Sequence, residues 1–292
     1  MAELPDWFNA VEGPVTAALG GSVVGQALRS WGSSEVWRIS SESGSVVVKR
    51  GRHGMMREAR VYAELVAPLA LLAPEILFLD RFPDCVVMVM RDVGVVTLEQ
   101  NPSRAGYEQA ARLLAAIHAV PVEGLSVPAD LRRLPESFLD CLPVIEGGLR
   151  RWRPDLSRSL EAVGAALVGR LSGREHVVHG DVEAKNFVLG AGGLTLIDWP
   201  TASVSGHLGD VYTLARAAAS VGIDRADVLR WYSGGAVSPA LAGRVDVGGL
   251  CWTVEAVEWI VREGAVTVPD SIGWLDGLMD DLETLRVAVE SR

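Results

Sequence analysis

A short string in the second half of the chain combines the residue types that phosphoryl transfer requires. It reads His179-Gly180-Asp181, four further residues and then Asn186, and twelve residues later an apolar run ends in Asp198. An aspartate beside an acceptor hydroxyl can orient that hydroxyl and take its proton. A second carboxylate and a side-chain amide supply the hard oxygen ligands that Mg²⁺ prefers. A loop with two chance acids is the alternative, but the two features at this spacing favour transfer of a phosphoryl group to a hydroxyl.

The same segment resembles the aminoglycoside phosphotransferase and choline kinase-like superfamily, whose members are relatives of protein kinases. The equivalent strings there are HGDxxxxN and IDW or IDF, and the resemblance extends from about residue 23 to residue 220. It implies that Asp181 is the catalytic base, that Asn186 and Asp198 bind Mg²⁺, and that ATP or GTP is the phosphoryl donor. It also implies an α+β, bilobal protein-kinase-like fold, with a small N-terminal lobe of antiparallel sheet and one helix and a larger, mainly helical C-terminal lobe.

Lysine is rare in this chain, which has 25 arginines but only two lysines, Lys49 and Lys185. Where arginine serves as the general positive charge, a remaining lysine is a candidate for a place that needs a compact ammonium. Lys49 ends the run Val46-Val47-Val48 and resembles the strand-borne lysine of the family, which implies contact with the α- and β-phosphates. Lys185 precedes Asn186, and its position leaves open whether it reaches the phosphates or faces solvent.

A helix with the sequence Arg57-Glu58-Ala59-Arg60-Val61 follows the first strands. It resembles the REARV-type helix of the family, which implies an ion pair between Glu58 and Lys49. A solvated helix glutamate is the alternative, and Glu64 is the second choice for the pair.

Two further stretches resemble the nucleotide site of the family. Gly32-Ser33-Ser34 lies where the phosphate-covering loop belongs, although it lacks the GxGxxG string of protein kinases, and this implies that Ser33 and Ser34 contact phosphate. The run from Met88 to Val93 resembles the hinge between lobes. It implies that backbone groups near Met90 and Val93 bind the adenine edge.

Other residues are expected to support the catalytic loop rather than to touch substrate. Asp210 resembles the residue at the start of the helix that anchors this loop, and His179 is expected to brace it as well. His118, at the end of an apolar helix, is expected to be a packed core histidine. Asp210 follows Asp198 by only twelve positions, and the eleven residues between them contain no recognisable activation loop, so no protein substrate is expected.

The pattern of apolar residues predicts the elements that position these groups. Strands are expected over residues 23–30, 36–39, 46–49, 76–80, 85–90, 177–178, 187–189 and 194–197. Helices are expected in the first 20 residues and over 55–65, from about 103, and over about 209–221, 224–232, 250–263 and 271–290, whereas 120–174 is hard to place. This order predicts a nucleotide-binding lobe over residues 1–92 and a catalytic and substrate-binding lobe over residues 93–292.

Composition limits the partners. The chain of 292 residues is 49% hydrophobic with a net charge of −10, which is typical of a globular protein and argues against a nucleic-acid partner. Three widely spaced cysteines support neither a zinc site nor a disulfide framework. The acidic start does not resemble a signal peptide, and the most apolar stretch, 66–79, is interrupted by prolines. No membrane partner is therefore expected, and the cytoplasm is the expected location.

The C-terminal part suggests the kind of acceptor. Residues 246–292 contain ten acidic and three basic residues, and Trp252, Glu255 and Trp259 are spaced to share one helical face. An acid between two indoles could bind a cation, so the acceptor is hypothesised to be a positively charged small molecule such as an aminated antibiotic. An acidic surface with core tryptophans is the alternative. Three functions stay open: an antibiotic phosphotransferase, a metabolic kinase for choline, homoserine, a sugar or a nucleoside, and a non-catalytic nucleotide-binding regulator.

Overall fold

The computed structural model describes residues 4–31, 33–154, 160–167, 170 and 175–291. The chain forms two compact units, and neither coincides with a single stretch of sequence. Unit 1 consists of residues 1–101 and 185–201, and unit 2 consists of residues 102–184 and 202–292. An antiparallel sheet dominates unit 1 and helices dominate unit 2, so the predicted α+β fold is confirmed.

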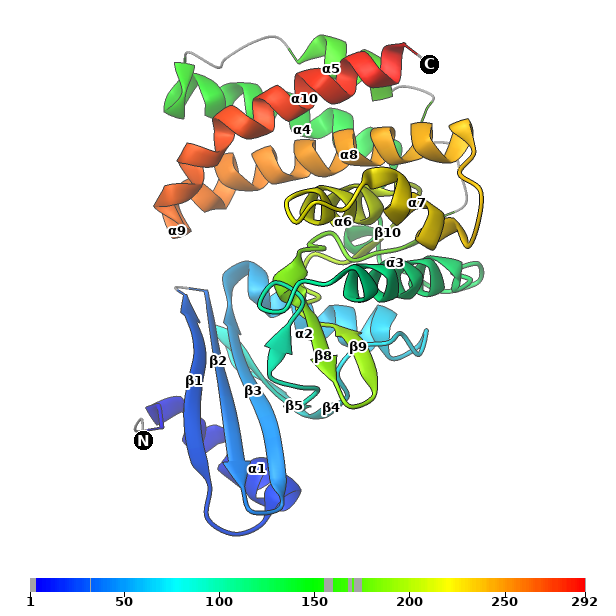
Figure 1. The fold of residues 1–292 in the computed structure, drawn as a ribbon. Helices are drawn as coiled ribbons and strands as arrows, with labels where there is room; N and C mark the ends of the chain where they lie inside the picture. Colours follow the sequence, from blue (N-terminus) through cyan, green and yellow to red (C-terminus); the bar gives the residue numbers. More distant parts are fainter. Residues whose placement is uncertain (1–3, 32, 155–159, 168–169, 171–174, 292) are drawn as a thin grey trace. The chain divides into compact units, whose positions relative to one another are not determined.

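The sheet of unit 1 has five antiparallel strands in the order β1-β2-β3-β5-β4 (Figure 1). Their bounds are Val24–Trp31 for β1, Ser34–Ser41 for β2, Gly44–Arg52 for β3, Ile76–Arg81 for β4 and Cys85–Arg91 for β5. The 3₁₀ helix η1 (Asp6–Ala10) and helix α1 (Glu12–Leu19) pack against one face, where Phe8, Val15 and Leu19 meet Val46 and Val48. Alternate residues of β3 therefore point to the opposite face, and Lys49 is one of them.

Two smaller pieces complete unit 1. The 3₁₀ turn η2 (His53–Met56), helix α2 (Arg57–Val61) and the π-helical turn η3 (Tyr62–Val66) follow one another without a break, close to the predicted helix over 55–65. A second sheet has the order β6-β8-β9, with β6 at Val96–Thr97, β8 at Phe187–Gly190 and β9 at Gly193–Leu196. The 3₁₀ turn η6 (Ala184–Asn186) leads into β8.

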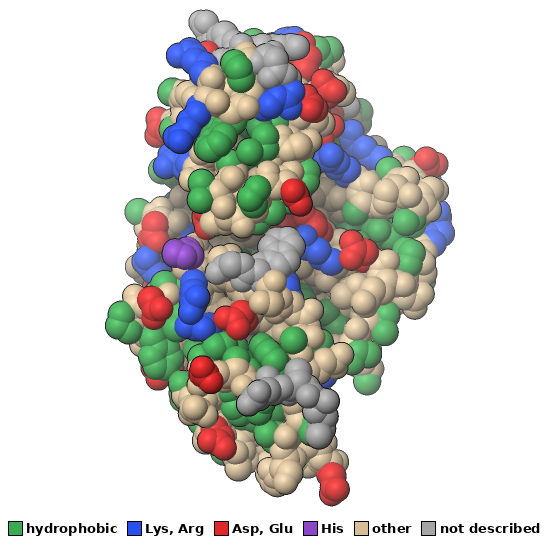
Figure 2. All heavy atoms as spheres, turned by 90° about the vertical axis from the view of Figure 1, so that its left-hand side faces the viewer, with side chains coloured by type: hydrophobic (Ala, Val, Ile, Leu, Met, Phe, Trp, Pro, Cys, Tyr) green, Lys and Arg blue, Asp and Glu red, His purple; other side chains and the backbone are tan. Residues whose placement is uncertain are grey.

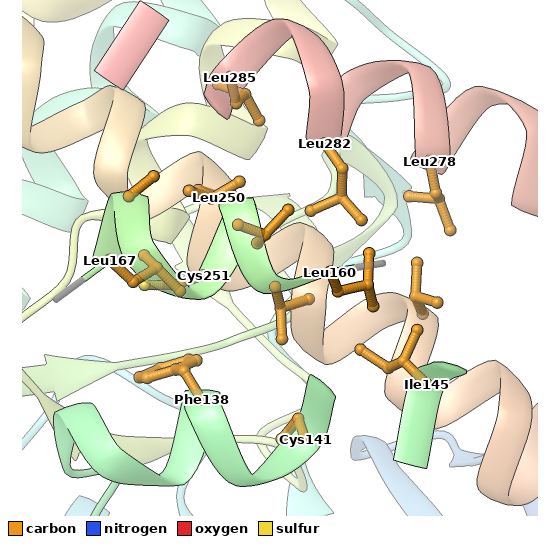
Figure 3. Close-up of a cluster of buried hydrophobic side chains, with 14 of the residues drawn as sticks. Phe138, Cys141, Ile145, Leu160, Leu167, Leu250, Cys251, Leu278, Leu282 and Leu285 are labelled. Atoms are coloured by element: carbon orange, nitrogen blue, oxygen red, sulfur yellow. The ribbon is translucent and has the colours of Figure 1, made fainter. Parts of the chain in front are cut away.

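Helices dominate unit 2, and several of them enclose an apolar core. Phe138, Ile145, Leu250 and Leu282 are among the fully buried residues of this core, which lies among α4, α5, α8 and α10 (Figure 3). The helices are α3 (Arg104–Ala119), α4 (Pro135–Trp152), α5 (Glu161–Leu167), α6 (Gly209–Ala219), α7 (Arg225–Ser233), α8 (Pro239–Trp259), α9 (Ala265–Thr267) and α10 (Leu275–Glu290), with the short turns η4 (Ala129–Leu131), η7 (Ile260–Gly264) and η8 (Pro269–Trp274). A two-stranded ribbon pairs β7 (His176–Val178) with β10 (Ser203–Ser205).

Helix α8 begins at Pro239, eleven residues before the predicted start at 250. Its first turn has a clear local cause, because the Ser238 hydroxyl accepts a hydrogen bond from the Leu241 N–H at 3.1 Å and proline occupies the first helical position. Gly248 lets this helix approach the start of α6 closely: a Cβ atom there would lie 2.4 Å from the Leu208 carbonyl carbon. Within the described ranges, no helix combines the length and the apolar character needed to cross a membrane.

Candidate active site

Lys49 is the centre of a buried charge cluster in unit 1. Its Nζ lies 2.5 Å from Glu58 Oε2 and donates a hydrogen bond of 2.5 Å to Asp198 Oδ1. Lys49 is 4% exposed and Glu58 is 1% exposed. Burial lowers the pKa of Lys49, but the charges of Asp198 and Glu58 outweigh it and leave that pKa above its ordinary value. Burial also raises the pKa of Glu58, against the opposing effect of Lys49. The ammonium is therefore charged and holds two carboxylates.

Helix α2 also fixes the segment after Asp198. Glu58 Oε1 accepts a hydrogen bond from the Trp199 N–H at 3.0 Å, and the Arg57 side chain donates to the Pro200 carbonyl at 2.6 Å. Trp199 is fully buried, and its indole N–H donates to the Leu196 carbonyl at 3.0 Å. Asp198 itself has a φ of +68°, in the left-handed region that aspartate enters more readily than most residues. The contacts on both sides hold its carboxylate toward Lys49.

A second cation joins this cluster. Arg29 Nη1, from strand β1, lies 3.0 Å from Asp198 Oδ2, and its side chain is 30% exposed. Lys49 binds one oxygen of the Asp198 carboxylate and Arg29 binds the other. Sequence reasoning missed Arg29, because no motif marks this position among the chain's many arginines.

The hairpin of β8 and β9 brings Asn186 and Asp198 to the same end. Phe187 pairs with Leu196, and the Ile197 N–H then donates to the Asn186 carbonyl at 2.9 Å. Asn186 therefore precedes one strand and Asp198 follows the other, at the open end of the hairpin. Asn186 is 2% exposed. The spacing of twelve residues seen in the sequence is thus the length of one hairpin.

The residues at this hairpin end fit a magnesium ion. An amide oxygen and a carboxylate are hard donors, and Mg²⁺ in phosphoryl-transfer sites takes one or two carboxylates together with water and substrate phosphates. The two cations already on Asp198 show that its carboxylate attracts positive charge. Among the residues that the structure describes, no three or more His, Cys, Asp or Glu side chains gather as a metal cluster. The donors present at this end of the hairpin are the amide oxygen of Asn186 and the carboxylate of Asp198.

The loop that carries Asp181 belongs to unit 2 and is fastened by Asp210. The Asp210 carboxylate accepts the N–H of His179 at 2.7 Å and the N–H of Gly180 at 2.9 Å. Gly180 has a φ of +81°, a conformation that glycine adopts without strain. The His179 ring is fully buried, and its Nδ1 accepts the Asp181 N–H at 3.3 Å. Asp181 itself is half-buried.

A chain of side chains stands behind Asp210. His118 Nε2 lies 3.2 Å from Asp210 Oδ2, and His118 Nδ1 lies 3.0 Å from the Tyr232 hydroxyl. Burial acts to raise the pKa of Asp210, but the hydrogen bonds from His118 and from the backbone outweigh it, and the pKa is about 2. His118 is buried, as expected from its place in helix α3. Its contact with Asp210 and the role of Tyr232 were not anticipated from the sequence.

The other predicted nucleotide-side residues lie at the ends of strands in unit 1. Gly32 falls outside the described residues. The Ser33 carbonyl accepts the Arg52 N–H at 2.8 Å, whereas Ser34 is buried and its hydroxyl has no hydrogen-bond partner in the described parts of the chain. Met90 is buried within β5, and Val93 follows that strand half-buried.

The segment just after β5 is held by a side-chain clamp. Arg38 donates to Asp92 Oδ2 at 2.6 Å, to Asp92 Oδ1 at 3.1 Å and to the Gly94 carbonyl at 2.6 Å. The Ser45 hydroxyl adds a hydrogen bond to Asp92 at 2.7 Å. Burial acts to raise the pKa of Asp92, but these donors lower it below its ordinary value. The backbone around Val93 is therefore fixed from both sides.

The three residues proposed for acceptor binding have separate partners. The Trp252 ring lies 6.3 Å from the Tyr212 ring, between ring centroids, and Glu255 forms an ion pair of 3.1 Å with Arg133. Trp259 stacks on Trp274 with 6.4 Å between ring centroids. Each of the three residues therefore contacts a different neighbour within unit 2.

Hydrophobic side chains lie on the surface of unit 2 over the end that carries α9 (Figure 2). Three large exposed hydrophobic residues belong to this region: Trp259 is 38% exposed, Trp274 is 50% exposed and Val266 is 74% exposed. The stacked indoles of Trp259 and Trp274 form an exposed aromatic edge on this unit.

Known proteins resemble this chain in sequence pattern and in fold. A model of the phosphotransferase enzyme family matches residues 25–243. No curated protein matches the chain by sequence. A choline/ethanolamine kinase family protein from Mesorhizobium loti has a similar structure, with 16% identity, a TM-score of 0.65, and coverage of 97% of this chain and 99% of the other.

Two proteins named as phosphotransferases have similar structures as well. A thermostable mutant of an aminoglycoside phosphotransferase, in a ternary complex with ADP and hygromycin B, shares 16% identity and covers 97% of each chain, with a TM-score of 0.62. A macrolide 2′-phosphotransferase from Brachybacterium faecium shares 16% identity and covers 94% of this chain and 98% of its own, with a TM-score of 0.58. These likenesses confirm the fold expected from the sequence.

Proposed function

Because the chain belongs to the phosphotransferase enzyme family, we propose that it transfers the γ-phosphoryl group of ATP or GTP to a hydroxyl of an antibiotic. The observation that carries this proposal is the buried cluster in which Lys49 binds both Glu58 and Asp198 at 2.5 Å. A buried charge is costly unless it is paired, so three charged side chains at this depth indicate a functional site. Residues 1–92 would form the nucleotide-binding lobe, and residues 93–292 would form the lobe for catalysis and acceptor binding.

The nucleotide side uses residues of unit 1. The Lys49 ammonium would bind the α- and β-phosphates while Glu58 keeps it in place. Ser33, in the turn before β2, and Ser34, the first residue of β2, would contact phosphate, and backbone groups near Met90 and Val93 would bind the base. The clamp of Arg38 on Asp92 and Gly94 supports this last assignment, since it fixes the backbone at that point.

Asn186 and Asp198 would hold Mg²⁺ at the open end of their hairpin. The ion supplies neutralisation of charge on the phosphates during transfer. The chain's own contribution is to present two hard oxygen donors from a rigid hairpin.

On the acceptor side, Asp181 would orient the hydroxyl and take its proton as the oxygen attacks phosphorus. The proton moves from the acceptor oxygen to the Asp181 carboxylate, and the nucleoside diphosphate leaves. Asp210 and His179 would keep the loop in shape, since Asp210 binds two of its N–H groups. Preorganisation of this kind is the main contribution a protein makes to phosphoryl transfer.

An antibiotic acceptor is supported by two of the proteins that share the fold, which are named as aminoglycoside and macrolide phosphotransferases. A metabolic kinase is the alternative, supported by the choline/ethanolamine kinase family protein. The acidic C-terminal part favours a cationic acceptor, although Arg133 already neutralises Glu255. A non-catalytic regulator is the weakest candidate, because Lys49, Asp181, Asn186 and Asp198 are all present. We expect the enzyme to act in the cytoplasm, since its three cysteines are free.

A turnover screen tests this proposal. Purified protein is incubated with Mg-ATP or Mg-GTP and a panel of aminoglycoside, macrolide, peptide and nucleoside antibiotics and common hydroxylated metabolites, and mass spectrometry follows the gain of one phosphoryl group by the acceptor. Phosphorylation of one antibiotic class supports the proposal, whereas efficient use of a single metabolite at micromolar concentration favours the metabolic kinase. A panel in which only uncharged compounds react would exclude the cationic acceptor. Nucleotide binding without any transfer would favour the regulator.

A further inference from the structure

A β-bulge in strand β1 decides which face of the sheet Arg29 occupies. From Val24 to Ala27, each residue of β1 pairs with β2 in one register, and from Arg29 onward the register is shifted by one residue. Leu28 is the extra residue. A bulge inserts one residue into one strand and changes the direction of the side chains that follow it.

The shift places Arg29 in the same cross-strand row as Lys49. Arg29 pairs with Val36 of β2, and Val36 pairs with Lys49 of β3. Residues directly opposite one another in an antiparallel sheet project to the same face. Arg29 and Lys49 therefore project to one face, where both reach the carboxylate of Asp198.

Without the bulge, the register of the first half of β1 would set Arg29 opposite Glu35. Glu35 projects to the other face, where it accepts a hydrogen bond from the Trp7 indole at 2.9 Å and pairs with Arg50 at 3.4 Å. A one-residue change of register moves a side chain from one face of a sheet to the other. The bulge is thus the reason why Arg29 reaches Asp198.

Arg29 also balances the charge of the cluster. Lys49 carries one positive charge between the negative charges of Glu58 and Asp198, which leaves one negative charge in a buried place. The guanidinium of Arg29, at 3.0 Å from Asp198 Oδ2, makes the four groups neutral together. A magnesium ion on Asp198 would bring two positive charges to the same carboxylate. Arg29 and the ion therefore compete to bind the oxygen atoms of Asp198 and to neutralise the one negative charge of that carboxylate.

We propose that Arg29 is a positioning residue that competes with Mg²⁺ for Asp198 and must release this carboxylate for the metal to bind. The proposal rests on the assignment of Asp198 as a metal ligand made above. It gives Arg29 two effects: it keeps Asp198 neutralised and oriented in the absence of metal, and it raises the concentration of Mg²⁺ that the site requires. At 30% exposure, its side chain has solvent beside it into which the guanidinium can withdraw.

Direct binding of Mn²⁺, as a paramagnetic substitute for Mg²⁺, tests the competition without any turnover. Free Mn²⁺ is measured by electron paramagnetic resonance while it is titrated into the nucleotide-free protein. Arg29→Gln is expected to bind Mn²⁺ more tightly than the wild type, on the order of fivefold, the size expected when a partly exposed ion pair no longer competes. Arg91→Gln is the matched control: it removes one arginine from the same sheet at an exposed position, where it pairs with Glu75, and it is expected to behave like the wild type.

Two results would overturn the proposal. The first is an Arg29→Gln protein, shown to be folded by its circular dichroism and melting temperature, that binds Mn²⁺ no more tightly than the wild type. The second is equal Mn²⁺ affinity in the wild type and in Asp198→Asn, which would mean that Asp198 is not the metal ligand. Failure of the proposed function would give a different set of results. A protein that phosphorylates no acceptor in the screen can still bind Mn²⁺ more tightly when Arg29 is replaced by glutamine.

Discussion

The ammonium of Lys49 and the carboxylate of Asp198 are joined by a hydrogen bond of 2.5 Å across 149 residues of sequence. Glu58, on helix α2, contacts the same ammonium. It also accepts a hydrogen bond from the backbone N–H of Trp199, the residue that follows Asp198. Lys49 therefore holds two carboxylates in a buried place, and its removal would leave both without the cation that they share.

Replacing Lys49 tests this dependence. Lys49→Met leaves Glu58 and Asp198 buried without their shared cation, and breaking a buried ion pair in this way costs about 3–5 kcal/mol. We expect urea unfolding at pH 7.5 to show a loss of that size. In the double variant Lys49→Met/Glu58→Gln part of the loss should return, because one stranded charge is gone while the amide oxygen can still accept the Trp199 N–H. A Lys49→Met protein as stable as the wild type would show that the cluster contributes nothing to folding.

Asp181 is expected to contribute to the rate and not to nucleotide binding. Removal of a general base typically slows an enzyme by about 10²–10⁴-fold, so Asp181→Asn should lose kcat by this factor against the acceptor found in the screen. Binding of Mg-ADP, measured by calorimetry, should stay at the wild-type level. Glu183→Gln is the control, since this exposed carboxylate lies in the same loop. Unchanged turnover in Asp181→Asn would refute the assigned mechanism.

His118 is expected to support the catalytic loop through the hydrogen bond between its Nε2 and Asp210. To donate to Asp210, its Nε2 must carry a proton, and Nδ1 of the neutral ring can then accept from Tyr232. The amide of His118→Gln can still donate to Asp210, whereas His118→Leu cannot. We expect the leucine variant to lose about 1–3 kcal/mol of unfolding free energy, the cost of leaving a buried acceptor short of a donor, together with part of kcat.

The His118→Gln variant should retain most of the unfolding free energy, measured by urea unfolding, and most of kcat, measured by steady-state turnover. Equal losses in the two variants would mean that the size of the ring matters and its hydrogen bond does not.

The buried position of His207 predicts that the protein loses stability as the pH falls. Its Nδ1 accepts the Gly209 N–H at 3.1 Å, and its Nε2 has no hydrogen-bond partner among the described residues. Burial lowers its pKa from 6.5 to about 4. The unfolded chain then binds a proton between these values and the folded chain does not, so the unfolding free energy should fall as pH drops from 6.5 toward 4, by up to about 3 kcal/mol.

His207→Asn keeps an oxygen that can accept the Gly209 N–H and removes the titration. Its unfolding free energy should change less between pH 6.5 and 4.5 than that of the wild type, as measured by urea unfolding at several pH values. Parallel pH profiles for the two proteins would exclude His207 as the cause of the acid sensitivity.

The sequence was informative where short-range spacing decides the structure. Asn186 and Asp198 could be paired from sequence because a hairpin of fixed length joins them, and Lys49 could be placed because a β-branched run precedes it. The five strands of the first sheet were predicted close to their observed bounds for the same reason. In each case the neighbours in the chain are also the neighbours in space.

Other features depend on contacts that no local pattern contains. Arg29 reaches Asp198 through a bulge at Leu28, and a shift of register leaves no signature in the residue types. Helix α4 was not predicted, since Pro143 lies within it and proline ordinarily ends a helix. The first half of α8 includes Gly248 and Gly249, which weaken a helical pattern, although their small size is what permits its close contacts with α6.

The residues hypothesised to bind the acceptor show a third reason why the sequence could not predict the structure around them. Trp252, Glu255 and Trp259 share a helical face by spacing, but the groups that pack against that face come from other elements. Glu255 contacts Arg133 and Trp259 contacts Trp274, and both partners are distant in sequence from the residues that they contact. Helical periodicity therefore predicted a face and could not predict what covers it.

The discontinuity of unit 1 has a consequence for synthesis on the ribosome. When residue 101 has been made, Lys49 and Glu58 are present, but the hairpin that supplies Asp198 and the Trp199 N–H follows only after residues 102–184. The emerging N-terminal segment therefore lacks one side of its ion cluster and two strands of its second sheet while residues 102–184 of unit 2 are being translated. The first unit can be completed only after residues 102–184 of the second unit have been synthesised, so the order of folding cannot simply follow the order of the sequence.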